Sequence, residues 1–368
     1  MQTPAQSSHA ILREAFINQL EPAAVFDACR ASPPDGFTID EAADGTPVFE
    51  ADFDLLTTAD DDLQQRIAAW PGFRLWSRAL RWRTSFVGTT VSEYALFAAG
   101  IDAASQLLLL KGEIGRRRRL TIIKDIPQDS PLLDARENAH AETLCKAAVE
   151  AGFVLVEGQA LAYVPIDFST TSEYLGRLSA SRRKDIRRKL RSREELDVEV
   201  LPCGSPRFSD AALVTEFHGL FEQVYAQSEI HFDHPQAAFF ARLLADPACG
   251  GIVFAYRHAG RLIGWNLCFE SNGRLVDKYI GLRYPDARRH NLYAVSWMHN
   301  LEYALQRGLD AYVAGWTDPQ VKAQLGARFT FTRHAVYARS ALLRALLRRL
   351  HGSFERDRAW RASPGATP

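Results

Sequence analysis

The stretch 251–283 decides the fold, and it reads GIVFAYRHAGRLIGWNLCFESNGRLVDKYIGLR. Its apolar runs at 251–257, 261–269 and 275–283 have the character of strands, and short joints that contain glycine separate them. The second joint carries Asn272-Gly273, and Asn-Gly between two apolar runs is the strongest short-range signal for a β-hairpin. We therefore predict three consecutive antiparallel strands.

Helical and strand-like segments alternate on both sides of this meander. Asn291 is placed to start a helix that ends at Gly308, since asparagine favours the position before a helix and glycine the position after it. The whole order, β-α-α-β-β-β-α-β-α-β, predicts the α/β (α+β) class, with a mixed, mostly antiparallel sheet flanked by helices. The other predicted elements are strands at 198–201, 310–314 and 329–337, and helices at 210–228, 235–245, 292–307 and 319–325.

The first half contains a strand-helix-strand passage. A strand is predicted at 120–124, a helix at 133–151, and two further strands at 153–157 and 161–166. A chain of 368 residues is long enough for two domains. We expect an N-terminal α/β domain at 1–170, a second domain at 171–340, and an amphipathic helix and tail at 341–368. No clear internal sequence repeat relates the two halves.

Charge, cysteine content and apolar runs limit which partners and which cell compartment are expected. The 44 basic and 44 acidic residues cancel, so attraction of the whole chain to DNA is not expected, although a local groove for a phosphate-bearing ligand remains open. The five cysteines form no C-x-x-C pair, as in a reduced cytoplasmic protein. Residues 1–10 lack the features of an export signal, and no apolar run approaches the roughly 20 residues that span a bilayer. We predict a cytoplasmic protein without a transmembrane segment.

A basic stretch at 178–191 lies near the start of the second domain and holds seven Arg and Lys residues. Read as a helix, it places Leu178, Ile186 and Leu190 on one narrow apolar face. Two interpretations stay open: a solvated amphipathic helix, or a helix that faces an anion in a cleft. In the second, the residues that bind substrate are Arg183, Arg187 and Arg188.

Three features together resemble the FemAB-like and CelD-like branch of the GNAT acyltransferase superfamily. They are the basic segment 178–188, the strand end and turn at 279–285, and Gly315 followed by Lys322 seven residues later and Gly326 four further on. The resemblance implies a sheet that splays between its central strands, with an acyl-CoA in the opening as co-substrate and no permanently bound cofactor. It also implies two GNAT-like halves.

The chain departs from this branch at two positions, and from the ordinary GNAT pattern at a third. Members carry an acidic residue two before the glycine and an aromatic residue before the lysine, where this sequence has Val313 and Val321. The GNAT pyrophosphate loop is partly matched at 289–294, with Leu292 at a position where glycine is expected.

The resemblance assigns Lys322 to stabilising the tetrahedral intermediate of acyl transfer. A surface lysine that caps a helix is the alternative. The strand 275–283 would contact the pantetheine arm through the main chain of Tyr279, Ile280 and Gly281. The loop 286–292 offers backbone N–H groups and positive charge at a helix start, which suits phosphates. Its cofactor-binding candidates are Arg288, Arg289 and Asn291, with His290 a further candidate.

The acceptor pocket is predicted at the joint 227–234 between the first two helices of the domain. Glu229 and His231 are the candidate acid/base groups there, because an imidazole titrates near neutral pH. His234 is assigned to substrate binding, and Asp233 is either a further acid/base group or the cap of the next helix. The pair His231-x-x-His234 is too sparse for a metal site, so none is predicted.

The function that these features predict is N-acyl transfer from acyl-CoA to an amine of a sugar, a peptide or a cell-envelope precursor. One alternative keeps the fold but takes the acyl group from aminoacyl-tRNA. The neutral charge and the absence of a long paired-helix insertion favour acyl-CoA over tRNA. The other alternative is a catalytically inert GNAT-like binding protein.

Overall fold

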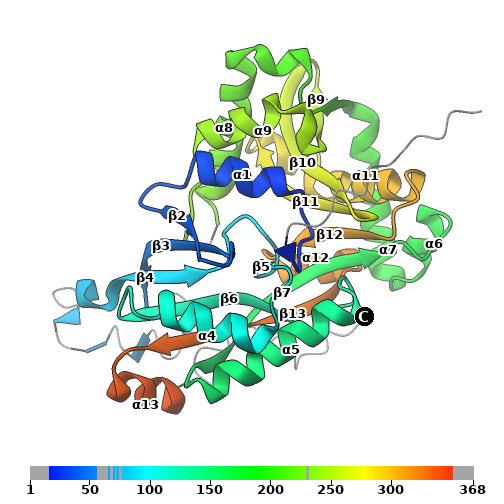
Figure 1. Ribbon diagram of the computed structural model, residues 1–368. Helices are drawn as coiled ribbons and strands as arrows, with labels where there is room; N and C mark the ends of the chain where they lie inside the picture. The colour runs from blue at the N-terminus through cyan, green and yellow to red at the C-terminus, as the bar shows by residue number, and fades with distance from the viewer. Residues whose placement is uncertain are drawn as a thin grey trace, which may run out of the picture.

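A single large sheet organises the protein (Figure 1). The computed structural model describes residues 16–55, 65–66, 69–70, 72–73, 77–228 and 232–350. Within these residues eleven strands form the sheet in the order β2-β3-β4-β6-β13-β7-β12-β11-β10-β9-β8, and β1 pairs with β5 apart from it. The β4/β6 and β11/β12 pairs are parallel, and the other pairs are antiparallel. The predicted class and the mostly antiparallel sheet are confirmed.

The first half of the chain supplies one end of this sheet. Its elements are β1 (Phe16–Ile17), α1 (Ala23–Ala31), β2 (Thr38–Glu41), β3 (Pro47–Asp54), η1 (Ser77–Leu80), β4 (Arg81–Val87), β5 (Phe97–Ala98), α4 (Ala103–Glu113), β6 (Leu120–Gln128), α5 (Ala135–Glu150) and β7 (Val154–Pro165).

The second half supplies the other end. Its elements are α6 (Thr171–Gly176), α7 (Ala180–Leu190), η2 (Arg191–Glu195), β8 (Asp197–Pro202), η3 (Pro206–Ser209), α8 (Ala211–Tyr225), α9 (Ala237–Ala245), η4 (Pro247–Cys249), β9 (Gly251–His258), β10 (Arg261–Ser271), β11 (Arg274–Leu282), α10 (Asp286–Arg289), α11 (Leu292–Gln306), β12 (Ala311–Gly315), α12 (Pro319–Leu325), β13 (Arg328–Ala338) and α13 (Ala341–Leu350).

The two halves repeat one order of elements and exchange their last strands. The run β3-β4-α4-β6-α5-β7 corresponds to β10-β11-α11-β12-α12-β13, and in each run the third strand lies parallel to the second. However, β7 pairs with β12 of the second half, and β13 pairs with β6 of the first. The exchanged strands also pair with each other. The sheet of each half is therefore completed by a strand from the other.

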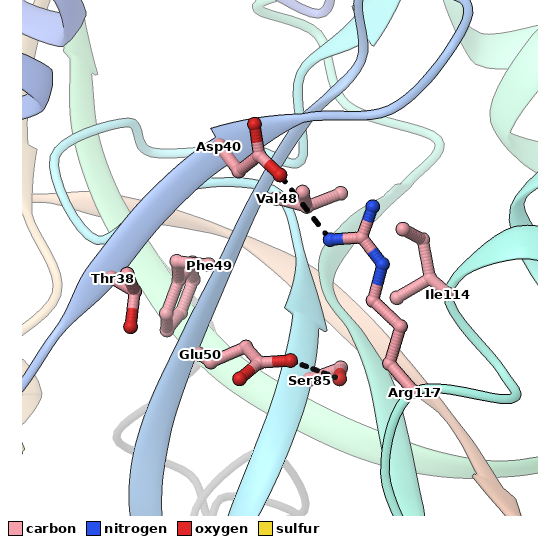
Figure 2. Close-up of a pocket in the computed structure, with 8 residues that line it drawn as sticks. All are labelled: Thr38, Asp40, Val48, Phe49, Glu50, Ser85, Ile114 and Arg117. Atoms are coloured by element: carbon pink, nitrogen blue, oxygen red, sulfur yellow. Dashed lines mark hydrogen bonds and ion pairs between the residues drawn. The ribbon is translucent and has the colours of Figure 1, made fainter.

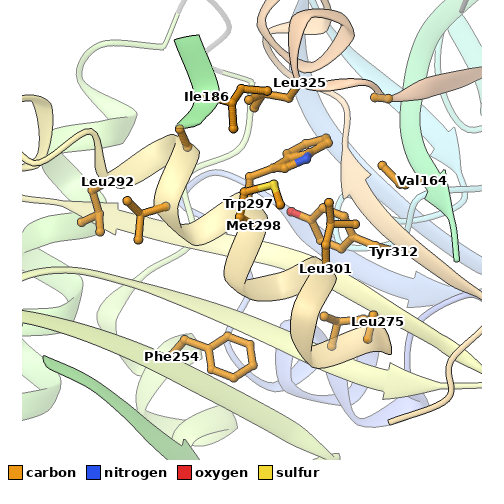
Figure 3. Close-up of a cluster of buried hydrophobic side chains, with 14 of the residues drawn as sticks. Val164, Ile186, Phe254, Leu275, Leu292, Trp297, Met298, Leu301, Tyr312 and Leu325 are labelled. Carbon is orange, nitrogen blue, oxygen red and sulfur yellow. The ribbon is translucent and has the colours of Figure 1, made fainter. Parts of the chain in front are cut away.

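Helices cover both faces of the sheet. In the second half, α11 packs on one face, where Trp297, Met298 and Leu301 meet side chains of the strands (Figure 3). Helices α8, α9 and α1 cover the opposite face, and the core there contains Phe217, Phe240 and Trp265. In the first half, α4 and α5 cover one face, and Leu343 and Leu347 of α13 pack on the other. Among the described residues, no helix combines the length and apolar character needed to cross a membrane.

The predicted elements of the second half agree with the structure, and α12 matches its predicted bounds of 319–325. Gly308 ends its helix with φ at 66°. The first half differs from its predicted elements in two ways. The strands predicted at 153–157 and 161–166 are one strand, β7, because its ladder with β13 is interrupted only by an irregularity at 158–159 and resumes at Ala160 opposite Phe331. Strands β2, β3 and β4 were not predicted. The boundary between 170 and 171 stays a prediction.

Candidate active site

The central opening lies between β11 and β12. These parallel strands pair over three positions only, ending at Val276 opposite Val313. Beyond that point β11 continues to Leu282 without β12 beside it. Residues 277–280 are half-buried, although they lie in the middle of the sheet. The main chain of β11 is thus left free for a ligand over the predicted cofactor-binding residues Tyr279, Ile280 and Gly281.

A β-bulge at Lys278 sets the directions of the side chains in the opening. Leu267 of β10 pairs with Tyr279 while Cys268 pairs with Asp277, so Lys278 is the extra residue. Bulges re-aim side chains and are frequent next to active sites. The bulge sends the Tyr279 ring into the aromatic cluster of α8 and α9, where Phe240 lies 5.3 Å away.

Lys322 closes one end of the opening. Its residue is only 4% exposed, and its Nζ donates hydrogen bonds to the carbonyl oxygens of Ala314 at 2.6 Å and Gly315 at 3.0 Å. An ammonium group has three donors, so one remains for a further acceptor. Burial lowers the pKa of Lys322 to about 8, against the opposing charges of Glu93, Asp277 and Asp318. The predicted lysine is therefore a buried group and not a surface helix cap.

Gly315 leaves space beside this amine. A side-chain carbon at Gly315 would lie 3.9 Å from Lys322 Nζ and 3.7 Å from the carbonyl oxygen of Asp277, and its φ of 78° disfavours other residues. The glycine thus keeps a gap between the end of β12 and the free part of β11.

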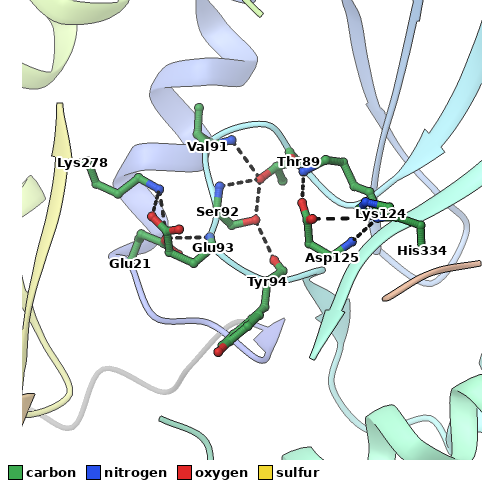
Figure 4. A network of polar contacts seen from close by, with 10 residues as sticks. All are labelled: Glu21, Thr89, Val91, Ser92, Glu93, Tyr94, Lys124, Asp125, Lys278 and His334. Carbon is green, nitrogen blue, oxygen red and sulfur yellow. Dashed lines mark hydrogen bonds and ion pairs between the residues drawn. The ribbon is translucent and has the colours of Figure 1, made fainter. Parts of the chain in front are cut away.

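Lys278 holds two carboxylates that come from the first half (Figure 4). Its Nζ lies 2.6 Å from Glu93 and 3.2 Å from Glu21, and both glutamates are at most 3% exposed. Burial alone would lower the pKa of Lys278, but the two carboxylates outweigh burial and raise it. Burial raises the pKa of Glu21, and Glu93 adds to that rise. Two carboxyl groups thus share one ammonium group.

The first half reaches the opening through the segment 88–95. This segment lies against β6 where β4 and β6 part, with Ala95 N donating to Asp125 O at 2.9 Å. Next to Glu93, the ring of Tyr94 contacts that of Trp316, 6.4 Å between centroids. The segment 88–95 thus occupies the place where β4 and β6 part in the first half. It also places Glu93 at the opening between β11 and β12 in the second half.

Asp277 is the hub of a buried polar network below the opening. Its Oδ2 accepts hydrogen bonds from Asn300 Nδ2 and from the Tyr312 hydroxyl, both at 2.9 Å. Asn266 Nδ2 lies 3.5 Å from its Oδ1. Burial raises the pKa of Asp277 to about 6, so this carboxyl group titrates near neutral pH.

The predicted phosphate loop leads into α11. Asn291 precedes the helix in the left-handed conformation, and its side chain donates to Ser192 Oγ at 3.0 Å instead of capping the helix. Arg288 donates to Gln227 Oε1 at 2.6 Å and lies over the ring of Tyr284. The Arg289 side chain is 72% exposed, 3.7 Å from Asp286.

The basic helix α7 lies along the helical side of this site. Arg182 reaches the carbonyl oxygen of Ala323 in α12, and Ser192, just beyond α7, meets Asn291 before α11. Ile186 is buried, as its apolar face predicted. Arg187 is exposed, Arg188 pairs with Asp185 at 2.5 Å, and Arg183 donates to the carbonyl oxygens of Gly176 and Leu178.

The predicted acceptor segment is only partly described. Glu229 and His231 lie outside the described residues. His234 Nε2 lies 2.7 Å from Glu222 Oε1, and the His234 ring stacks on Tyr225. Burial raises the pKa of Asp233. The residue that precedes α9 is Gln236, so Asp233 does not cap that helix.

A separate pocket of about 220 Å³ lies on the first half (Figure 2). Two pairs of its polar side chains contact each other, Asp40 with Arg117 at 3.4 Å and Glu50 with Ser85 at 3.3 Å. None of the predicted site residues lines it.

The structure brings Lys322, Tyr279, Ile280 and Gly281 together at the opening. Four further charged residues gather there that the sequence did not single out. Asp277 and Lys278 could have been noticed in the sequence, because their charged side chains interrupt an otherwise apolar strand. Glu21 and Glu93 could not, because they lie in a half whose fold the sequence left unclear.

Comparison with protein families identifies part of the chain. Residues 180–323 match the family model described as an Acetyltransferase (GNAT) domain, which is less than half of the chain. No curated protein matches the sequence.

Solved structures share the fold over nearly the whole chain. The C-terminal domain of a putative lysylphosphatidylglycerol synthetase from Agrobacterium fabrum matches with a TM-score of 0.54 at 11% identity, over 90% of this chain and 91% of that one. L-PGS from Bacillus licheniformis matches with 0.50 at 10% identity, over 90% and 97%. FemX matches with 0.52 at 10% identity, over 88% and 97%. At such identities these matches show a common fold. Residues 180–323 thus match a GNAT domain model, and nearly the whole chain shares its fold with these three structures.

Proposed function

We propose that this protein is an N-acyltransferase of the FemAB-like GNAT branch, which moves an acyl group from an acyl-CoA to an amine of a sugar, a peptide or an envelope precursor. The observation that carries the proposal is Lys322 at the end of the opening, with one N–H left for a developing oxyanion. The free main chain of Tyr279 to Gly281 supports it, since an amide-bearing arm could pair with this strand edge.

The reaction needs few groups. Once neutral, the acceptor nitrogen attacks the thioester carbonyl carbon, and Lys322 stabilises the charge that forms on the carbonyl oxygen. The C–S bond then breaks to release a thiolate, which takes up the second proton that the nitrogen gives up after the attack. The attacking amine must lose a proton. Asp277 is a candidate to receive it, through water, because its pKa of about 6 lies near the pH of the cell.

The two buried carboxyl groups beside Lys278 support an amine as acceptor. Glu21 and Glu93 each keep one buried oxygen, Oε2, without a hydrogen-bond partner among the described residues. A buried carboxylate oxygen without a hydrogen-bond partner is costly, and a nearby cation reduces that cost. An acceptor that arrives as an ammonium ion fits this site better than an alcohol.

An aminoacyl-tRNA donor is the second candidate. It is supported by the resemblance to FemAB-like enzymes, which include enzymes that take the acyl group from aminoacyl-tRNA, and by the likeness in fold to FemX. An inert binding protein is the third, since Val313 and Val321 depart from the branch and Leu292 from the GNAT pyrophosphate loop.

We expect an acyl-CoA to raise the melting temperature. A ligand that binds only the native state stabilises it by about 2.7 kcal/mol when present at a hundredfold excess over its Kd. The measurement is a thermal-shift titration with acetyl-CoA and longer acyl-CoAs at millimolar concentration. Stabilisation by a charged tRNA alone would favour the second candidate, and stabilisation by neither would favour the third.

We expect the exposed arginines of α7 to act on KM. Replacing Arg187 and Arg188 by Gln should raise KM in a salt-sensitive way with little change in kcat, since exposed charges attract ligands through a screened field. Arg183→Gln is the comparison, because its hydrogen bonds to Gly176 and Leu178 predict a lower melting temperature instead. Unchanged KM at low salt in the double variant would leave α7 with a structural role only.

A further inference from the structure

Two histidines and a glutamate converge where α7 ends and α11 begins. Glu195 is the last residue of η2, His258 is the last of β9, and His290 follows α10. One ligand atom of each lies within 4.8 Å of the others, and the two imidazole rings are 4.1 Å apart between centroids. Three segments that are distant in sequence thus bring three metal-ligating side chains to one point.

The contact between His290 and Glu195 is not an ordinary hydrogen bond. His290 Nδ1 lies 3.0 Å from Glu195 Oε2, yet this buried nitrogen has no hydrogen-bond partner among the described residues. The two atoms are close without pointing at each other. That arrangement suits a nitrogen and an oxygen whose lone pairs both point at a third atom between them.

We propose that Glu195, His258 and His290 bind one divalent transition-metal ion of the zinc type. Imidazole nitrogen and carboxylate oxygen are ordinary zinc ligands at about 2.0–2.2 Å, which places ligand atoms closer together than 4.8 Å. The Glu195 side chain is 61% exposed and can move to close that distance. Three protein ligands leave a fourth position open, as in zinc sites that take water or substrate.

The place of this site suggests its use. His290 is directly followed by Asn291, which starts α11, and Asn291 is already bound to Ser192 of η2. A cation there would tie the two segments together and add positive charge at the helix start, where the donor's phosphates are expected. This second part rests on the proposed function, and it predicts that the metal strengthens donor binding.

Metal binding is tested without any donor. The protein is freed of metal with a chelator and titrated with Zn²⁺ against a chromophoric indicator. We expect one ion per chain, and at least tenfold weaker binding in His258→Gln and in His290→Gln. The control is Glu194→Gln, which removes the neighbouring exposed carboxylate. Equal affinity in the wild type and the two histidine variants would overturn the proposal.

A second pair of histidines provides a competing place. His218 and His234 both lie near Glu222, at 3.2 Å and 2.7 Å. Loss of zinc binding in His218→Gln, with binding kept in His290→Gln, would also overturn the proposal. Co²⁺ bound in place of zinc should show the visible absorption of a low-symmetry site, and this absorption should be lost in His290→Gln.

The two parts fail in distinguishable ways. If zinc binds at these residues and acyl-CoA shifts the melting temperature more with zinc than without, both stand. If zinc binds and acyl-CoA never shifts the melting temperature, the proposed acyl-CoA donor is wrong, whereas the proposed metal site stands. If acyl-CoA shifts the melting temperature equally in wild type and His290→Gln, with or without zinc, the metal has no part in donor binding.

Discussion

Lys322→Ala should lower kcat by about 10²–10³, because removal of one oxyanion donor costs that much in enzymes that use one. The effect should appear in kcat more than in KM, since the donor acts mainly in the transition state. The measurement is steady-state kinetics with the acyl donor identified by thermal shift. Lys184→Ala, on the exposed side of α7, is the control and should keep wild-type rates.

Burial of Lys322 adds a cost in stability. Its removal leaves the carbonyl groups of Ala314 and Gly315 without a donor, which costs about 1–3 kcal/mol. Lys322→Met keeps most of the side-chain volume and separates packing from charge. An alanine variant within about threefold of wild-type kcat would remove Lys322 from the mechanism, since a lost donor costs far more.

Both kcat and stability should depend on pH through Lys322. Its pKa of about 8 lies below the usual 10.5, so kcat should fall as pH rises through about 8 and the ammonium loses its proton. Lys322→Arg should retain part of the activity and lose this fall, because arginine stays protonated. For stability the sign is opposite: the unfolded chain holds this proton more tightly, so the contribution of Lys322 to the free energy of unfolding rises between about pH 8 and 10.5.

Lys278→Met should lower the free energy of unfolding by about 3–5 kcal/mol, because it leaves Glu21 and Glu93 buried without their cation. Denaturant titration measures the loss. Lys146→Met is the matched control, since its pair with Glu142 is exposed and worth at most about 1 kcal/mol.

Two tests identify unpaired charge as the cause. Adding Glu21→Gln and Glu93→Gln to Lys278→Met should recover most of the stability. Lowering the pH should also reduce the loss, because the pKa of Glu21 is raised and a protonated Glu21 needs no cation. A loss below about 1 kcal/mol would mean that water already reaches the glutamates, since a truly buried pair costs more to break.

The second half could be predicted because its signals are local. Asn272-Gly273 fixes a hairpin, Asn291 and Gly308 bound α11, and the spacing from Gly315 to Lys322 fits one turn and a short helix. Each signal acts over a few residues, so no knowledge of the rest of the fold was needed. The opening and the role of its lysine were expected from the resemblance to the GNAT branch, and not from these local signals.

The partners across the halves could not be predicted, because no local pattern encodes them. Nothing near Glu93 indicates that it pairs with Lys278, 185 positions away. The ladder of β13 with β6 and β7 likewise depends on contacts between distant segments. Phe232 shows the same limit, since its ring packs against Phe37 and Phe86 of the first half, although its neighbours in sequence belong to the second.

The exchange of β7 and β13 has a consequence for synthesis of the chain. While the ribosome is still making the second half, β6 and β7 have no strand between them, and both present open edges on which other chains can pair. The first half cannot close its sheet until residues 328–338 leave the ribosome. The sheet of the first half is thus completed only after most of the second half has been made, and its open edges need protection until then.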